Sequence, residues 1–350
     1  MTLSPAAIRD LFFGLGFAVL LLSGLSLGRD YLVPIAVAVL VWFLINALSE
    51  SMQRVAPRAP GWLTTILSVM VLFAVILFIA QIIVRNVGAL GAGIEDVDGV
   101  LLQSMERLLA RVGLAQRIDL DALWNGVRVE ALFTGAFNAA RMFAGDVTLV
   151  FLYVLFLLLD QRFYSVKLRA LVPDPMRRAA LEATLRHIAD TTRAYLFLMS
   201  LISAGVGVAT WLICLAFGVP GPGFWGFLAF ALNFIPTIGS ILGVAIPAVY
   251  GLLTVESDQA IVGLLLSLAA LQFVAGEVVL PRVMGHRLNL SSFIIMLSLV
   301  VWGAMWGPAG MFLAIPIMVI LMIVFSEFPS TRPIAIALSR EGTVAERPVF

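Results

Sequence analysis

The chain has 350 residues, of which 61% are hydrophobic and 12% charged, and its formal net charge is +1. Its mean hydropathy of +1.06 lies far above that of soluble domains and indicates an integral membrane protein. A chain with a single lysine and no long basic run excludes nucleic acid as a partner, because neutralising phosphates requires a basic patch.

The first 84 residues predict three transmembrane helices, at 11–27, 31–48 and 61–84. None of these stretches contains a charged residue, and their lengths suit helices that cross a hydrocarbon layer of about 30 Å. The short link at 28–30 predicts that the first two helices are antiparallel neighbours. We expect membrane lipids to surround these helices.

Residues 85–145 have a different character, since six arginines and seven acidic residues interrupt the apolar ones. Apolar residues still recur there at helical spacing, at Val97, Leu101, Met105, Leu108 and Val112. We therefore expect an extramembrane helical arm.

Residues 146–350 are predicted to form a C-terminal transmembrane core. A fourth span at about 146–159 is followed by 160–193, which holds seven basic and four acidic residues. Asp174 and Pro175 are typical of a helix start, so this segment predicts a basic surface helix that is separate from a fifth span at 194–218.

The basic residues outside the spans predict the orientation of the chain. Arg9, Arg54, Arg58 and the basic residues of 160–193 fall on one side of the membrane if the spans alternate. Short positively charged loops stay in the cytoplasm, so the basic helix and both termini are expected there.

Three further apolar stretches complete the core, at 224–255, 260–280 and 291–327. The first and third contain prolines and glycines and predict discontinuous helices, either re-entrant hairpins or full spans. In the third, the interruptions are Gly303, Gly307, Pro308, Gly310 and Pro316. The whole chain thus predicts an all-α polytopic membrane protein with broken or hairpin helices in its last third.

The sharpest interruption is the stretch NFIPTIGS at 233–240. A proline within a span frees backbone groups, and lipid tolerates such groups only where they face protein or a water-filled cavity. Pro236 therefore predicts a helix break, where Asn233 and Thr237 satisfy the freed groups or contact a solute. A tight extramembrane turn between two short spans is an equally open interpretation.

Three residues within or just after this stretch have predicted structural roles. Gly239 and Gly243 are four residues apart and permit close approach of a neighbouring helix. Pro247 is expected to make a second break.

Glu277 is the one acidic residue that lies inside a predicted span away from its ends. Burying an unpaired carboxylate costs several kcal/mol, so this group must be protonated, paired or beside water. Two interpretations remain open. It forms a structural ion pair with Arg282 or Arg287 near the surface, where Pro281 ends the span, or it handles protons or a solute.

Two motifs typical of enzymes occur in the wrong context. Residues 24–28 match the G-x-S-x-G nucleophile pattern around Ser26, but they end a predicted membrane helix and not a strand. Residues 221–226 match the dinucleotide pattern G-x-G-x-x-G, but no strand precedes them. We also find no metal-ligand motif and no phosphate-binding loop. The sequence therefore predicts no catalysis, no cofactor and no metal.

The last third of the chain resembles a known family. The segments NFIPTIGSILGVAIPAV, from Asn233, and EVVLPRVMGHRLNLSSFIIMLSLVVWGAMWGPAGMFLAIPI, from Glu277, are similar to the autoinducer-2 exporter family of bacterial permeases. The matching residues are Pro236, Gly239, Gln272, Glu277, Pro281, Gly285, Leu290, Gly303, Gly307, Gly310 and Pro316. One departure is Ser291-Ser292, where many members have a proline.

This resemblance implies a secondary transporter of the bacterial inner membrane that exports a small solute such as a signalling molecule, coupled to protons or sodium. We expect a homo-oligomer. The implied pathway residues are Asn233, Pro236, Thr237, Gly239, Gln272 and Glu277. The implied hinge or packing residues are Gly243, Pro247, Pro281, Gly303, Gly307, Gly310 and Pro316. The alternative is a non-transporting membrane scaffold that docks partners through the 85–145 arm.

Overall fold

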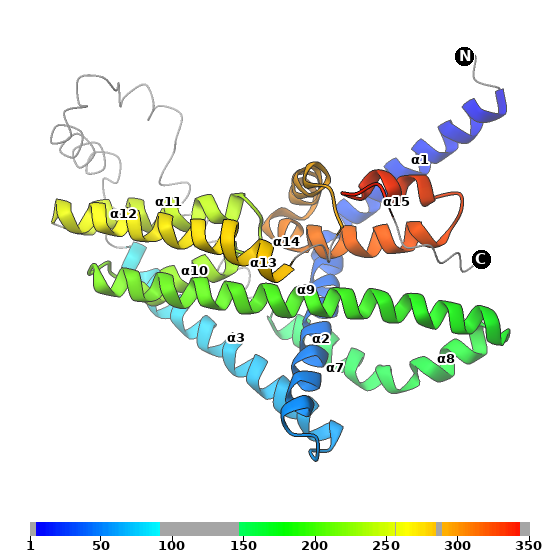
Figure 1. The fold of residues 1–350 in the computed structure, drawn as a ribbon, viewed down its shortest axis with the longest axis horizontal. Helices are drawn as coiled ribbons and strands as arrows, with labels where there is room; N and C mark the ends of the chain where they lie inside the picture. Colours follow the sequence, from blue (N-terminus) through cyan, green and yellow to red (C-terminus); the bar gives the residue numbers. More distant parts are fainter. Residues whose placement is uncertain (1–4, 92–146, 256, 285–288, 344–350) are drawn as a thin grey trace. The chain divides into compact units, whose positions relative to one another are not determined.

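The computed structural model describes residues 5–91, 147–255, 257–284 and 289–343 (Figure 1). Among these residues the regular secondary structure is helical, apart from one isolated bridge between Leu290 and Ser339. Six of the described helices are long and apolar enough to cross a membrane. The prediction of an all-α polytopic membrane protein is confirmed. The predicted arm lies outside the described residues from 92 onward.

The chain divides into two compact units. The first comprises Met1–Phe43, Thr148–Thr192 and Asn289–Phe350, and the second comprises Leu44–Val147 and Arg193–Leu288. Two long helices, α2 (Arg29–Val55) and α9 (Pro175–Ala216), contribute residues to both units.

The first unit contains, besides parts of α2 and α9, the elements α1 (Pro5–Leu27), α7 (Val147–Asp160), η1 (Gln161–Phe163), α8 (Tyr164–Leu171), α14 (Ser292–Glu327) and α15 (Arg332–Leu338). Only Gly28 separates α1 from α2, and helical hydrogen bonds continue through it, from its N–H to Gly24 and from Leu32 to its carbonyl. The prediction of antiparallel neighbours is wrong, because a link of one residue bends the chain without reversing it.

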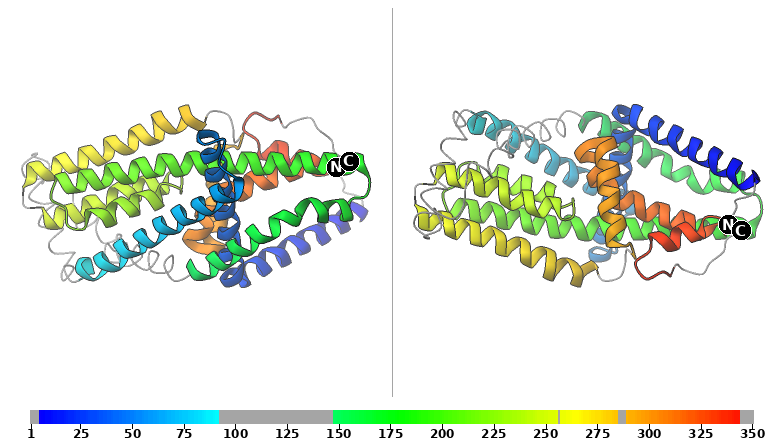
Figure 2. Two further views of the ribbon diagram at one scale, coloured as in Figure 1. Left: turned by 90° about the horizontal axis from the view of Figure 1, so that it is seen from below. Right: turned by 90° about the horizontal axis from the view of Figure 1, so that it is seen from above.

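Helix α14 is sharply bent, and Figure 2 shows its two arms running in different directions. Gly307 has φ +64° and ψ −146°, a conformation that is essentially restricted to glycine. A Cβ atom on Gly310 would lie 1.9 Å from the carbonyl oxygen of Trp302, so the two arms approach closely at the bend. The discontinuity predicted for 291–327 is therefore present at Gly307, whereas Pro316 is buried inside the second arm.

The second unit contains the remainder of α2 and α9 together with α3 (Gly61–Gly91), α10 (Pro222–Leu232), α11 (Ile238–Thr254), α12 (Asp258–Phe273), η2 (Val274–Val279) and α13 (Leu280–Met284). Helix α3 continues seven residues beyond the boundary predicted at 84.

Helix α9 corrects the prediction of a separate surface helix. Its 42 residues form one helix about 63 Å long, which joins the basic segment to the fifth span without a break. No proline or glycine lies between Met176 and Ala204, so nothing in the sequence stops the helix where its composition turns apolar.

The core of the second unit forms around the start of α10. Phe224 and Trp225 are fully buried and pack against Leu264 of α12 and Tyr250 of α11, whose ring centroid is 4.8 Å from that of Trp225. Trp225 also donates from Nε1 to the carbonyl oxygen of Pro220 at 2.9 Å. These contacts hold α10 and α11 in place beside α12.

Glycines allow α9 and α10 to cross at short range. A Cβ atom on Gly207 would lie 2.8 Å from the Gly226 carbonyl oxygen, and one on Gly226 would lie 2.7 Å from the Gly207 carbonyl oxygen. Gaps this small exclude any side chain at either position. The crossing fixes the polar end of α10 against α9.

Candidate functional site

The break between α10 and α11 is built around a strained turn. The N–H of Ile238 donates to the carbonyl oxygen of Pro236 at 2.7 Å, which closes a γ-turn centred on Thr237. Thr237 has φ +65° and ψ −59°, a rare conformation for a β-branched residue. Such strain costs about 1–3 kcal/mol and persists only where the surrounding structure imposes it.

The two helices on either side of this turn form a hairpin. They are joined by residues 233–237 and pack side by side, as both views of Figure 2 show. A Cβ atom on Gly239 would lie 1.7 Å from the carbonyl oxygen of Leu232, so only glycine fits where α11 begins. The 11 residues of α10 rise about 16 Å, half the thickness of a hydrocarbon layer.

Pro247 lies inside α11 and is buried, and the helix continues unbroken to Thr254. The predicted second break is therefore wrong. The residue one turn earlier, whose carbonyl faces the proline ring, is Gly243, and membrane helices tolerate such freed groups where neighbouring helices surround them.

Asn233, at the end of α10, is anchored to α9. Its Nδ2 donates to the Oγ of Ser203 at 2.9 Å, and Ser203 is fully buried. Ser203 was missed by the sequence analysis, although a serine in the apolar half of a span is a detectable signal of a polar contact between helices.

Gln272, near the end of α12, contacts the first turn of α11. Its Nε2 donates to the carbonyl oxygen of Ser240 at 3.4 Å. Its Oε1 is buried and has no hydrogen-bond partner among the described residues. A Cβ atom on Gly243 would lie 3.2 Å from Gln272 Nε2, so this glycine makes room for the amide.

A small apolar cluster joins these two polar contacts. Val206 of α9, Ala229 of α10 and Ala275 of η2 pack together, with Leu271 against them. Val206 and Ala229 lie about one helical turn from Ser203 and Asn233, and Leu271 directly precedes Gln272. The polar side chains of Ser203, Asn233 and Gln272 therefore lie next to the cluster where α9, α10 and the end of α12 pack together.

Glu277 lies in the π-helical turn η2, where the N–H of Leu280 donates to the carbonyl oxygen of Ala275, five residues earlier. Pro281, four residues after Glu277, has no N–H to donate to the Glu277 carbonyl, and a wider turn accommodates its ring. The helix continues beyond Pro281 to Met284, so the proline does not end the helix.

The Glu277 side chain is exposed, and within the described part of the chain it makes no hydrogen bond or ion pair. The predicted ion pair with Arg282 is absent, and Arg287 lies outside the described residues. An exposed carboxylate in an apolar helix and a π-helical turn are both features that occur frequently at functional sites.

The structure therefore brings together Asn233, Pro236, Thr237, Gly239, Gly243 and Gln272 around the hairpin, and it places Glu277 and Pro281 on the next turns of the Gln272 helix. Gly303, Gly307 and Gly310 lie at the bend of α14, in the first unit, and Pro316 lies in the second arm of the same helix. Ser26 lies in the last turn of α1 and not at a strand-to-helix turn. Among the described residues, no group of three His, Cys, Asp or Glu side chains gathers as a metal site would require.

Comparison with known proteins gives a consistent result. The model of the family described as AI-2E family transporter matches residues 15–330. AI-2 transport protein TqsA of Escherichia coli (strain K12) is 30% identical over 339 residues, which cover 93% of this chain and 94% of that protein. A presumed transport protein of Haemophilus influenzae is 27% identical over 93% of this chain and 94% of that protein. A presumed transport protein of Borreliella burgdorferi is 24% identical over 92% of this chain and 88% of that protein.

Proposed function

Because the chain belongs to the AI-2E transporter family, we propose that it is a secondary transporter that exports a small polar solute across the bacterial inner membrane. A multi-pass membrane protein of a transporter family requires a polar route through an apolar layer. The name of the E. coli relative supports a signalling molecule as the solute class.

The observation that carries this proposal is the unpaired Oε1 of Gln272 beside a strained helix break. A buried acceptor without a partner costs about 1–3 kcal/mol, and a hydroxyl or amine of a bound solute would recover that free energy. Asn233 and the turn at Thr237 form the opposite side of this site. With its base at one membrane surface, the short α10 would place the turn near the midplane, where transporters commonly bind solutes.

Glu277 is the proposed coupling group. Its carboxylate is free of protein partners in the described structure, so a proton or a sodium ion would compete for it directly. We further propose that both termini and the basic half of α9 are cytoplasmic, that the protein assembles as a homo-oligomer and that it catalyses no reaction.

The test is solute flux into proteoliposomes with a panel of small signalling molecules. Gln272→Met removes the amide and keeps the volume, so flux should fall at least tenfold while the folded yield is unchanged. Gln259→Met, on the exposed first turn of the same helix, is the matched control and should transport normally.

The scaffold alternative makes the opposite prediction. A scaffold would show no flux for any solute, and deleting residues 85–145 would remove its partners. Equal flux by the Gln272→Met and Gln259→Met variants would refute the proposed site while leaving a transport role elsewhere in the chain.

A further inference from the structure

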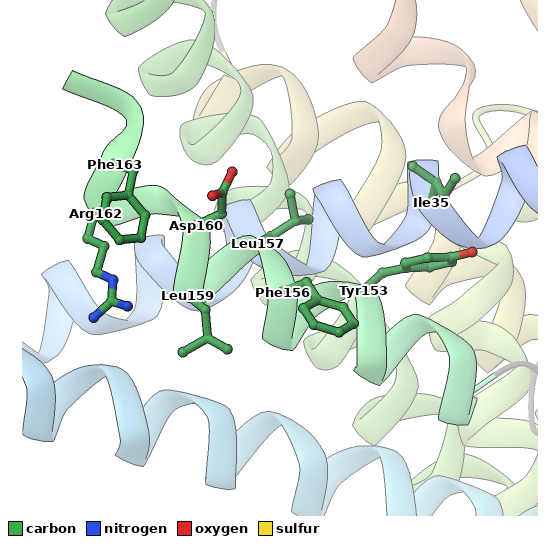
Figure 3. Close-up of a pocket in the computed structure, with 8 residues that line it drawn as sticks. All are labelled: Ile35, Tyr153, Phe156, Leu157, Leu159, Asp160, Arg162 and Phe163. Atoms are coloured by element: carbon green, nitrogen blue, oxygen red, sulfur yellow. The ribbon is translucent and has the colours of Figure 1, made fainter. Parts of the chain in front are cut away.

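The first unit contains a groove that takes no part in the proposed transport site. The groove, of about 430 Å³, opens where α7 passes into η1 (Figure 3). It is lined by Ile35, Tyr153, Phe156, Leu157, Leu159, Asp160, Arg162 and Phe163. Apolar side chains form most of its length, and charged side chains occur only at the η1 end.

At the η1 end of the groove lies an arginine that has no ion-pair partner among the described residues. The guanidinium of Arg162 lies 4.6 Å from the ring centroid of Phe163 and makes no ion pair with the described residues. The adjacent carboxylate of Asp160 is engaged elsewhere, since Lys167 Nζ donates to its two oxygens at 2.8 and 2.6 Å. Figure 3 shows the Asp160 and Arg162 side chains pointing in different directions. Arg162 is therefore available to an external anion.

The groove is held in shape by α2. Trp42 Nε1 donates to Gln161 Oε1 at 2.9 Å, and the Trp42 ring meets the Tyr164 ring edge-on at 6.2 Å between centroids. After η1, α8 exposes Val166 and Leu171 beside Lys167 and Arg169. Aromatic, basic and apolar side chains mixed in this way are typical of a helix at a membrane surface.

We propose that this groove binds one anionic phospholipid. An acyl chain would lie along Ile35, Phe156 and Leu159, and the phosphate would accept hydrogen bonds from Arg162, whose planar guanidinium suits a phosphate. The apolar lining favours a lipid over a free anion, and the unpaired cation favours an anionic headgroup. If 160–193 is cytoplasmic, as proposed above, the site faces the leaflet surface that attracts basic segments.

The test is lipid binding by the purified full-length protein, measured by native mass spectrometry and by the shift in thermal unfolding on adding phosphatidylglycerol, phosphatidylcholine or inorganic phosphate. Phosphatidylglycerol should bind and stabilise the protein, whereas the other two should not. Arg162→Gln should weaken phosphatidylglycerol binding roughly tenfold, the effect of one lost charge-assisted contact.

Two further variants make the result decisive. Arg169→Gln removes the same charge from α8, outside the groove, and should bind phosphatidylglycerol normally. Leu159→Trp fills the apolar part while keeping Arg162, and it should also lose binding. Equal losses for Arg162→Gln and Arg169→Gln would show diffuse surface attraction and overturn the proposal, as would equal binding of phosphatidylcholine or of free phosphate.

Discussion

The bend in α14 and the break between α10 and α11 differ in which residue adopts the positive φ and in which side chains surround it. In α14 the bend is made by Gly307, a residue that adopts a positive φ without strain, and its close contacts are between glycines and apolar or backbone groups. Between α10 and α11 the positive φ falls on Thr237, and polar side chains from two other helices converge on the break. Glycine at a bend needs only a packing explanation, whereas strain beside the unpaired Gln272 Oε1 is what the proposed binding site would explain.

Replacement of Gly239 by alanine should have the largest effect. Its Cβ atom would lie 1.7 Å from the Leu232 carbonyl oxygen, so the hairpin must open, at a cost above about 3 kcal/mol. Folded yield and thermal unfolding in detergent measure this. Gly205→Ala on α9 is the control, because a Cβ there has nothing within 4 Å, and a normal yield for both variants would contradict the close packing.

Gly307→Ala tests the other interruption. Alanine at φ +64° and ψ −146° should lower the free energy of unfolding by about 1–3 kcal/mol, since that conformation is strained for any residue with a Cβ. Thermal unfolding should record the loss. At matched amounts of folded protein, the flux per molecule should fall less in Gly307→Ala than in Thr237→Gly or Gln272→Met. A larger fall in Gly307→Ala would indicate that the solute binds near the bend of α14.

Thr237→Gly should raise stability. Glycine relieves the positive-φ strain, with an expected gain of about 1 kcal/mol after its larger entropy in the unfolded chain is subtracted. Flux should nevertheless fall, because the turn loses its fixed geometry. A destabilised variant would show that Thr237 makes compensating contacts, and unchanged flux would indicate that its strain is unrelated to transport.

Glu277→Gln should have the smallest effect on stability, within about 0.5 kcal/mol, because the exposed carboxylate has no described partner to lose. Transport should continue down a solute gradient but lose its response to an imposed proton or sodium gradient. Fluxes measured with and without each gradient in proteoliposomes separate the two effects. A variant whose gradient response equals that of the wild type would remove Glu277 from the coupling mechanism.

Much of this site could be predicted from the sequence, because a proline and polar residues within an apolar span have few physical explanations. The break at 233–237 and the roles of Gly239 and Gly243 as close-packing positions followed from that logic. The strain at Thr237 could not be predicted, since it depends on how the chain closes between Pro236 and Ile238.

Other features of the fold could not be predicted, because they depend on where a helix continues, and local composition does not determine that. The change from charged to apolar residues near Arg193 predicts an element boundary, yet α9 continues because no residue there stops a helix. The π-helical turn before Pro281 required the helix to extend beyond the proline, and Ser203 acquired a role only when α9 crossed α10.

The most direct test of the central claim is the accessibility of a cysteine at position 237. In a background with Cys214→Ala, which removes the single native cysteine, a hydrophilic maleimide should label the Thr237→Cys variant in membranes, and the transported solute should slow that labelling. A Val300→Cys control on the exposed apolar face of α14 should stay unlabelled. Labelling of position 237 that no transported solute slows, or no labelling at all, would contradict a solute pathway at the hairpin.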